Sequence, residues 1–171
     1  MTAVRASRVD DGPTLRAIEV AAGARFRDVG LEHVAADEPL SIEALGAYAA
    51  AGRSWVAVDD GGEPVGYVLV QAIGGGAHIE QLSVRPNRQG QGAGRALLAC
   101  VRHWAVEQEM SSVTLTTFNH VTWNRPLFEH LGFRAMAYDE LGPALLSVRR
   151  AEADRGLDPD LRSCMRWDLQ S

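Results

Sequence analysis

The chain has 171 residues, of which 46% are hydrophobic and 23% charged, so its composition fits a globular protein with one substantial core. A net charge of −5 argues against nucleic acid as a partner, and no apolar run approaches the roughly 18 residues of a membrane span. The N-terminus is polar where a signal peptide needs an apolar stretch, and Cys100 and Cys164 lack metal or redox spacing, so we expect one cytoplasmic domain over residues 1–171 without a metal.

In chain order the sequence predicts a strand, two helices and a three-strand meander, then a helix, a strand, a short helix and closing strands. Alternating apolar and polar residues indicate the strands, and apolar residues three or four apart indicate the helices. Glycine-rich turns at 60–63 and 74–76 separate the strands of the meander. The expected strands are 4–9, 55–58, 64–73, 78–84, 113–118, 134–138 and 163–169, and the expected helices are 13–28, 41–51, 92–109, 124–130 and 143–153.

The most specific feature lies between the strand 78–84 and the long helix that follows it. Pro86 ends the strand because proline has no N–H for the sheet, and Gln89 and three glycines up to Gly94 lead into the helix. Glycines let the main chain approach a ligand closely. The first N–H groups of a helix have no intrahelical partner, so together with the helix dipole they predict an anion site suited to a pyrophosphate.

Two other phosphate-binding motifs do not match this segment. A P-loop needs Lys-Ser or Lys-Thr after its glycines, and neither follows here. A dinucleotide fingerprint needs Gly-x-Gly-x-x-Gly directly after a strand, whereas Gly-x-Gly-x-Gly here follows a proline-containing arm. The remaining structural alternative is a glycine-rich turn that only begins a helix.

The pattern Val-x-Pro followed by Gln-x-x-Gly-x-Gly, formed by Val84, Pro86, Gln89, Gly92 and Gly94, resembles the acyl-CoA loop of the GNAT N-acyltransferase superfamily. The order of predicted elements resembles the GNAT fold over nearly the whole chain. The resemblance implies an α+β fold, with helices flanking a mixed, mostly antiparallel sheet of six to seven strands. A V-shaped splay between the fourth and fifth strands admits the acyl-pantetheine arm in that fold, so acetyl-CoA is implied as the co-substrate.

A second segment, residues 123–133, resembles the family region "Asn … Tyr-Glu-Lys-Leu-Gly-Phe". The resemblance gives Asn124 a contact with the pantetheine arm, and the alternative is a helix N-cap. Phe128 stands where many members have a tyrosine near the thioester sulfur. Because phenylalanine cannot donate a proton to the leaving thiolate, core packing is the alternative role for Phe128.

Acyl transfer to an amine needs a base, and Glu80 is the first candidate. Glu80 shares one face of its strand with His78, Leu82 and Val84, and a carboxylate on a mostly apolar face requires a reason. The resemblance gives this position a base in several members, often acting through water. His78 is the second candidate because histidine titrates near neutral pH. The alternatives are an ion pair of Glu80 across the sheet and a solvated His78 near a strand end.

Two further sets of residues follow from the resemblance. The acceptor amine would be recognised by the first two helices and their connection, where Glu19 is a candidate for the ammonium group and Phe26 and Tyr48 are aromatic candidates, although each is also an ordinary surface or packing residue. Arg25 is a polar candidate in the same region. The expected acetyl-CoA contacts are Leu82, Ser83, Val84, Gln89, Gly90, Gln91, Gly92, Ala93, Gly94, Arg95, Asn124 and Phe128.

Two functional hypotheses remain open. The first is an N-acetyltransferase that moves the acetyl group of acetyl-CoA to a primary amine of a small molecule or peptide by direct attack. The alternative is a catalytically weak or inactive acyl-CoA-binding regulatory module, for which Phe128 is the motive. Neither nucleic acid nor a membrane is an expected partner. The helix 143–153 and the strand 164–169 would offer an edge for a homodimer.

Overall fold

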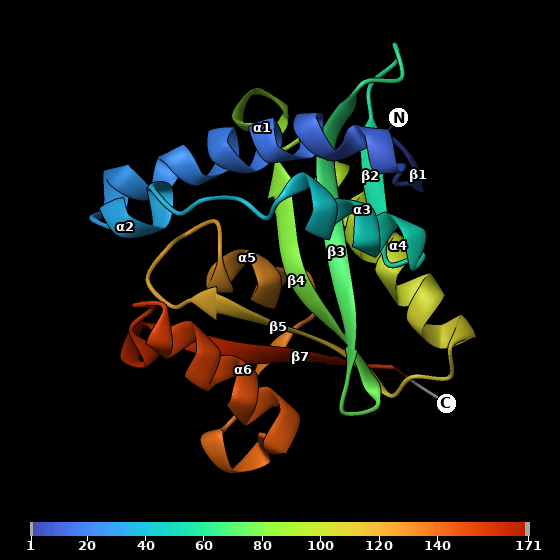
Figure 1. Ribbon diagram of the computed structural model, residues 1–171. Helices are drawn as coiled ribbons and strands as arrows, with labels where there is room; N and C mark the ends of the chain where they lie inside the picture. The colour runs from blue at the N-terminus through green and yellow to red at the C-terminus, as the bar shows by residue number, and fades with distance from the viewer. Residues whose placement is uncertain (1, 170–171) are drawn as a thin grey trace. The chain divides into compact units, whose positions relative to one another are not determined.

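The computed structural model describes residues 2–169, which form a mixed sheet and helices on both of its faces (Figure 1). The strands are hydrogen-bonded in the order β1-β2-β3-β4-β5-β7-β6. They are β1 (Ala3–Ala6), β2 (Ser54–Val58), β3 (Pro64–Ile73), β4 (Gly76–Val84), β5 (Ser112–Phe118), β6 (Arg134–Ala135) and β7 (Arg162–Asp168). The α-helices are α1 (Gly12–Gly23), α2 (Glu32–Ala35), α3 (Ile42–Ala50), α4 (Ala93–Glu107), α5 (Arg125–His130) and α6 (Pro143–Asp154).

Three of the expected elements end at least three residues earlier than expected. The first strand ends at Ala6, and a 3₁₀ turn follows it because the Asp11 carboxylate accepts a hydrogen bond from the N–H of Arg8 at 2.7 Å. The helix expected over 13–28 ends at Gly23 and continues as a 3₁₀ helix to Val29. The strand expected over 134–138 has two residues, and a 3₁₀ turn follows from Tyr138.

The chain divides into two compact units, and each is described by itself. The first unit comprises the residues up to Val70 together with Glu80–Val101. The second comprises Gln71–Ile79 together with the residues from Arg102 onward. The expectation of a single domain stays a prediction.

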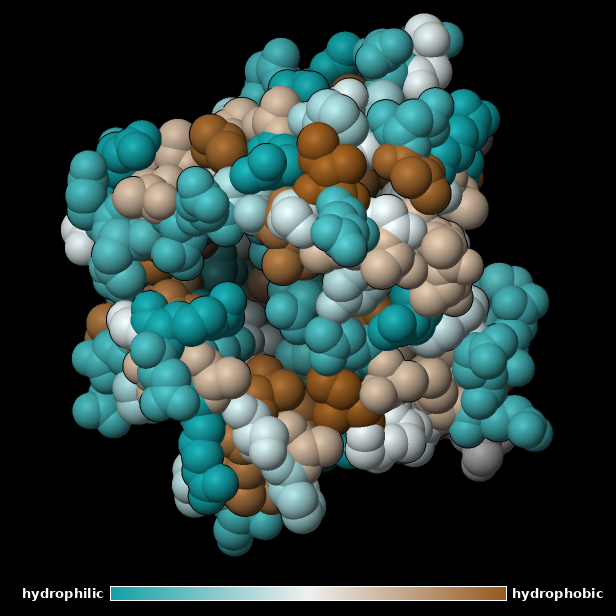
Figure 2. Space-filling model, in the orientation of Figure 1, coloured by the Kyte–Doolittle hydropathy of each residue, from teal (hydrophilic) through white to brown (hydrophobic). Residues whose placement is uncertain are grey.

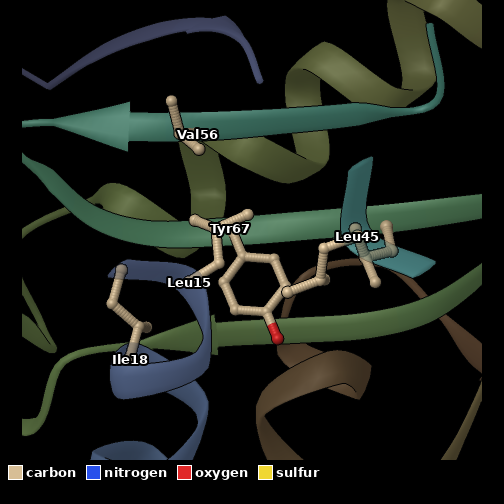
Figure 3. Close-up of a cluster of buried hydrophobic side chains, with 6 residues drawn as sticks. Leu15, Ile18, Leu45, Val56 and Tyr67 are labelled. Carbon is tan, nitrogen blue, oxygen red and sulfur yellow. The ribbon is translucent and has the colours of Figure 1, made fainter. Parts of the chain in front are cut away.

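The core of the first unit lies between the helices α1 and α3 and one face of the strands β2 and β3 (Figures 1 and 3). Ser41 begins α3 as the sequence predicts, because its hydroxyl accepts a hydrogen bond from the N–H of Ala44 at 3.1 Å. Each large apolar side chain buried here stabilises the unit by about 1.5–3 kcal/mol relative to exposure. The cluster consists of Leu15, Ile18, Leu45, Val56, Tyr67 and Leu69.

The second unit is built around the antiparallel pair β5 and β7, which is in register from Ser112↔Asp168 to Phe118↔Arg162. Helix α6 contacts one face, where the hydroxyl of Thr116 donates to Glu152 at 2.5 Å. Glu152 also pairs with Arg162 at 3.1 Å, so this buried carboxylate has a charge partner. The segment that leads into α5 contacts the other face, because successive strand residues alternate and Thr117 bonds Asn124.

The expectation that the last strand offers a free edge for a homodimer is wrong. Strand β7 lies between β5 and β6 in the sheet, so its main chain already has a partner on both sides at Met165 and Arg166. The sequence predicts a strand at 134–138, but it does not reveal that this strand pairs with β7. A homodimer stays a prediction, and a free edge of β7 no longer supports it.

Candidate active site

The loop between β4 and α4 has the geometry of an anion-binding turn. Pro86–Arg88 forms a 3₁₀ turn, Gly90 has φ of 77° and Gly92 has φ of 93°. An L-residue is strained at such angles, so the chain needs glycine there. Among residues 2–169, a Cβ built at Gly92 or Gly94 would meet no atom within 4 Å other than those of its chain neighbours and its own helix, which leaves the main chain open to a ligand. Helix α4 begins at Ala93, directly after this loop, so its first N–H groups point toward the same place.

Gln89 holds this loop to the end of β4. Its amide nitrogen donates to the carbonyl oxygen of Val84 at 3.1 Å, and its amide oxygen accepts a hydrogen bond from Arg25. A side-chain amide can donate to a carbonyl and accept from a guanidinium at the same time, and this network fixes the orientation of the Gln89 amide. The glutamine of the motif therefore sets the shape of the loop, and it connects the loop to the segment after α1.

The arginines beside the loop differ in how much charge they offer. Arg88 lies 3.6 Å from the carboxylate of Asp59, so part of its charge already has a partner. Arg95, in the first turn of α4, is exposed. A pocket of about 320 Å³ opens beside the loop, and Gln91 and Ala93 are among the residues that line it. The loop therefore fits a phosphate-containing ligand, with the N–H groups as its principal donors, whereas the pocket beside it is also lined by the carboxylates of Asp59 and Asp60.

Strand β4 presents main-chain donors at its unpaired edge. The parallel pairing of β4 with β5 covers only Ala77↔Val113 and His78↔Thr114, although both strands continue. The N–H of Arg85 donates to Val65 on the β3 side at 2.8 Å. Because N–H groups alternate along a strand, those of Val84 and Leu82 point to the opposite edge, where pairing with β5 has ended. The end of the pairing at His78 agrees with the splay between the fourth and fifth strands that the family resemblance implies.

The two candidate bases on β4 lie in different surroundings. Glu80 is exposed, whereas His78 is buried and its Nδ1 lies 2.8 Å from the hydroxyl of Thr114. Burial lowers the pKa of His78 to about 4, and the negative charge of Glu152 opposes this only in part. His78 is therefore neutral at pH 7, and the alternative of a solvated histidine at the strand end is wrong. A base with a pKa this low has little driving force to take a proton.

Glu19 belongs to a buried hydrogen-bond network that sequence reasoning missed. The hydroxyl of Tyr67 donates to Glu19 and accepts from Ser83, and the amide of Gln81 donates to Ser83 at 2.7 Å. Tyr67 is only 1% exposed, and Figure 3 shows its ring in the apolar cluster with the hydroxyl pointing away from Val56. A tyrosine inside an otherwise apolar strand was the available signal, since a buried phenol needs a partner.

Burial raises the pKa of Glu19, and the charge of Asp37 raises it further, while the hydrogen bond from Tyr67 and the charge of Arg16 lower it. A carboxyl whose pKa is higher in the folded chain favours folding below its unfolded pKa of about 4.3, and this stability is lost as pH rises through the folded pKa. We therefore expect Glu19→Gln to raise the midpoint of thermal unfolding at pH 7, by more than at pH 4. The control Glu43→Gln, at an exposed position of α3, should change little at either pH. A Glu19→Gln effect that is equal at both pH values would contradict the assignment.

The second unit holds the other two expected acetyl-CoA contacts. Asn124 precedes α5, but its side chain does not cap the helix: its oxygen accepts from the hydroxyl of Thr117 at 3.0 Å and from the N–H of Phe118 at 3.3 Å. The ring of Phe128 packs edge-on against Phe133, with centroids 5.8 Å apart. Both residues thus have structural partners, and their contact with acetyl-CoA stays a prediction.

The two aromatic candidates for the acceptor site also belong to the first unit. Tyr48 packs against the apolar cluster, and the guanidinium of Arg53 lies 5.3 Å from the centroid of its ring. Phe26 is half-buried in the 3₁₀ helix after α1. Within residues 2–169, no cluster of His, Cys, Asp or Glu side chains is arranged to hold a metal, and no helix is long and apolar enough to cross a membrane.

Several solved structures share this architecture. N-acetylglutamate synthase from Neisseria gonorrhoeae, complexed with coenzyme A and N-acetyl-glutamate, matches 100% of the chain with a TM-score of 0.74 and 20% identity. The ribosomal-protein-S18-alanine N-acetyltransferase from Escherichia coli matches 100% of the chain and 96% of its own, with a TM-score of 0.68 and 17% identity. PaiA N-acetyltransferase from Thermoplasma acidophilum, in complex with coenzyme A, matches 99% of both chains with a TM-score of 0.72 and 12% identity.

At identities of 12% to 20%, these structural matches establish a shared fold and nothing more. The chain spans 36% of the length of the N-acetylglutamate synthase, so that larger protein contains parts without a counterpart here. The model of the Acetyltransferase (GNAT) family matches residues 19–133, which is more than half of the chain and includes β4, the glycine-rich loop and α5. The chain therefore belongs to the GNAT family of acetyltransferases.

Proposed function

We propose that the chain is an acetyl-CoA-dependent N-acetyltransferase that acetylates a primary amine of a small molecule or peptide by direct attack. The observation that carries this proposal is the position of the loop from Gln89 to Gly94. It joins the open N-terminus of α4 to the part of β4 whose edge is not paired with β5. A pyrophosphate and a thioester of one co-substrate can be held by these two neighbouring features.

Each residue has a defined part in this proposal. Acetyl-CoA, the co-substrate of the family, supplies an acetyl thioester. The N–H groups of Gly92, Ala93 and Gly94 bind the pyrophosphate, and those of Leu82 and Val84 donate to the thioester carbonyl oxygen as it becomes negative. The remaining residues proposed to contact acetyl-CoA are Ser83, Gln89, Gly90, Gln91, Arg95, Asn124 and Phe128.

Glu80 acts as the base, directly or through water, and takes a proton from the ammonium group. The amine nitrogen then bonds to the carbonyl carbon while the C–S bond breaks, and the nitrogen passes its second proton to the departing thiolate or to water. The thiolate can leave without an acid because a thiol, with a pKa of about 8.5 for cysteine, is acidic enough for its anion to be a competent leaving group. Glu80 is preferred to His78 because Glu80 is exposed to an incoming amine whereas His78 is buried and neutral.

The second candidate function is an acyl-CoA-binding regulatory module, which Phe128 favours because the usual proton donor is missing. Titration calorimetry with acetyl-CoA and assay of free thiol on a panel of amines and peptides separate the two. Binding with thiol release supports the enzyme, and binding without release on any acceptor supports the module. Absence of binding at about millimolar acetyl-CoA would rule out both.

Restoring a tyrosine tests how much the missing proton donor matters. We expect Phe128→Tyr to raise kcat by less than about tenfold, because a thiolate leaves readily and a hydroxyl placed among Phe133 and its neighbours needs a partner. Steady-state kinetics with saturating acetyl-CoA measure this, with Phe118→Tyr as the matched control. A gain of about 100-fold would mean that thiolate protonation limits the native chain, and the regulatory module would become the better assignment.

A further inference from the structure

Helix α1 carries two opposite charges that do not satisfy each other. Arg16 and Glu19 are one turn apart on the same side of the helix. The Nε of Arg16 and the Oε2 of Glu19 are both buried and without a hydrogen-bond partner, and within residues 2–169 they are the two side-chain atoms of this kind. No ion pair joins the two residues, although the charge of Arg16 acts on Glu19. A buried polar atom without a partner is costly, so each of these two atoms calls for an explanation.

The network of Glu19 leads to the part of β4 that is proposed to hold the thioester. The other carboxylate oxygen of Glu19 accepts a hydrogen bond from the hydroxyl of Tyr67, which in turn accepts one from Ser83. Ser83 lies between Leu82 and Val84 on β4. Two hydrogen bonds that share the Tyr67 oxygen place the carboxylate of Glu19 within about 6 Å of the Ser83 hydroxyl. All of these residues belong to the first unit. An amine bound at Glu19 is therefore close to the strand segment that polarises the carbonyl.

We propose that Arg16 and Glu19 form the acceptor site for a small zwitterion, an α-amino acid or a close analogue, in which Glu19 Oε2 accepts from the ammonium and Arg16 Nε donates to the carboxylate. This inference rests on the proposed N-acetyltransferase function and names its acceptor class. One ligand would satisfy both unpartnered atoms, which it reaches when these two half-buried side chains rotate outward.

The chemistry fits the turnover of such an acceptor. Transfer of the acetyl group converts the ammonium into a neutral amide, so the product loses its charge attraction to Glu19 while its carboxylate remains. The ligand is thus held more strongly before the reaction than after it. Asp37 adds negative charge near Glu19, which favours any cation, but the positive charge of Arg16 one turn away disfavours a second ammonium group. A diamine is therefore the competing acceptor that the experiment must exclude.

The experiment compares acceptors that differ only in the carboxylate. Each of the twenty common L-amino acids is assayed beside the corresponding amine that lacks the carboxylate. For lysine this amine is a diamine, so the competing acceptor class is included. We expect the best amino acid to have a kcat/KM at least about tenfold above that of its amine. Arg16→Gln should raise KM for the amino acid by about tenfold and leave KM for the amine unchanged, and Arg16→Lys should retain part of the preference. Glu19→Gln should raise KM for both.

Matched controls remove the same charges elsewhere. Arg27→Gln and Glu43→Gln change exposed positions in the 3₁₀ helix after α1 and in α3, and they should leave both KM values unchanged. Thermal unfolding of each variant verifies that it is folded. Equal turnover of amino acids and their amines, an unchanged preference in Arg16→Gln, or acetylation confined to peptides would overturn the acceptor class while the N-acetyltransferase function stands. Acetyl-CoA binding with no transfer to any amino acid, amine or peptide would overturn both proposals.

Discussion

Gly92→Glu is expected to weaken acetyl-CoA binding by at least about 100-fold, to the point where titration calorimetry detects none at micromolar protein. The Cβ of residue 92 would project into space that the chain leaves open, and the new carboxylate would face the site proposed for the pyrophosphate. The new carboxylate would repel the phosphates, and its side chain would also cover the N–H donors of α4. The backbone contributes as well, since φ of 93° is strained for glutamate.

The control variant Gly52→Glu separates the effect of losing the anion site from the effect of backbone strain. Gly52 lies in the turn between α3 and β2, has φ of 73°, and a Cβ there would meet nothing within 4 Å. The Gly52→Glu substitution therefore adds a similar backbone strain and the same charge, but outside the Gln89–Gly94 loop. We expect this control to lose thermal stability to a similar extent and to keep the affinity of the parent for acetyl-CoA. Normal affinity in a folded Gly92→Glu variant would mean that the anion site lies elsewhere.

Elements with strong local signals could be predicted closely from the sequence. Pro64–Ile73 has the expected bounds, because a glycine-rich turn precedes it and the Gly74-Gly75 turn, with φ of 58° and 79°, follows it. Helix α3 begins after Ser41 because a serine side chain can bond the N–H of the third helical residue. The family fold was also within reach, since the spacing of Gln89, Gly92 and Gly94 between a strand and a helix is specific.

Features that depend on distant contacts could not be predicted. Helix α2 has four residues, too few for a period. The burial of His78 follows from its packing in the second unit beside Thr114, and local alternation says only which face it shares. The bonds of Glu19 with Tyr67 and of Gln89 with Arg25 join residues 48 and 64 positions apart. Glu19 was named as an ammonium candidate, but its buried unpartnered oxygen and the matching atom of Arg16 required the structure.

Glu80→Gln is expected to preserve acetyl-CoA affinity and to lower kcat/KM by about 100-fold, the usual scale for a general base. Glutamine keeps the size and polarity of this exposed side chain, so the loss reports on proton transfer. The loss should shrink as pH rises, because a larger share of the amine is then already neutral. Steady-state kinetics between about pH 6 and pH 9 measure it, and Glu43→Gln, at an exposed position of α3, provides the control.

The pH profile distinguishes this role of Glu80 from simple attraction of the acceptor. If Glu80 only binds the ammonium charge, KM rises, kcat is retained and the profile keeps the shape of the parent. That result would move the base elsewhere and leave the N-acetyltransferase function standing. The two proposed roles then have separable kinetic effects. Glu19→Gln raises KM because Glu19 holds the acceptor, and Glu80→Gln lowers kcat because Glu80 removes the proton. A kcat loss in Glu19→Gln that shrinks with rising pH, together with an unaffected Glu80→Gln, would assign the base to Glu19, whose pKa burial already raises.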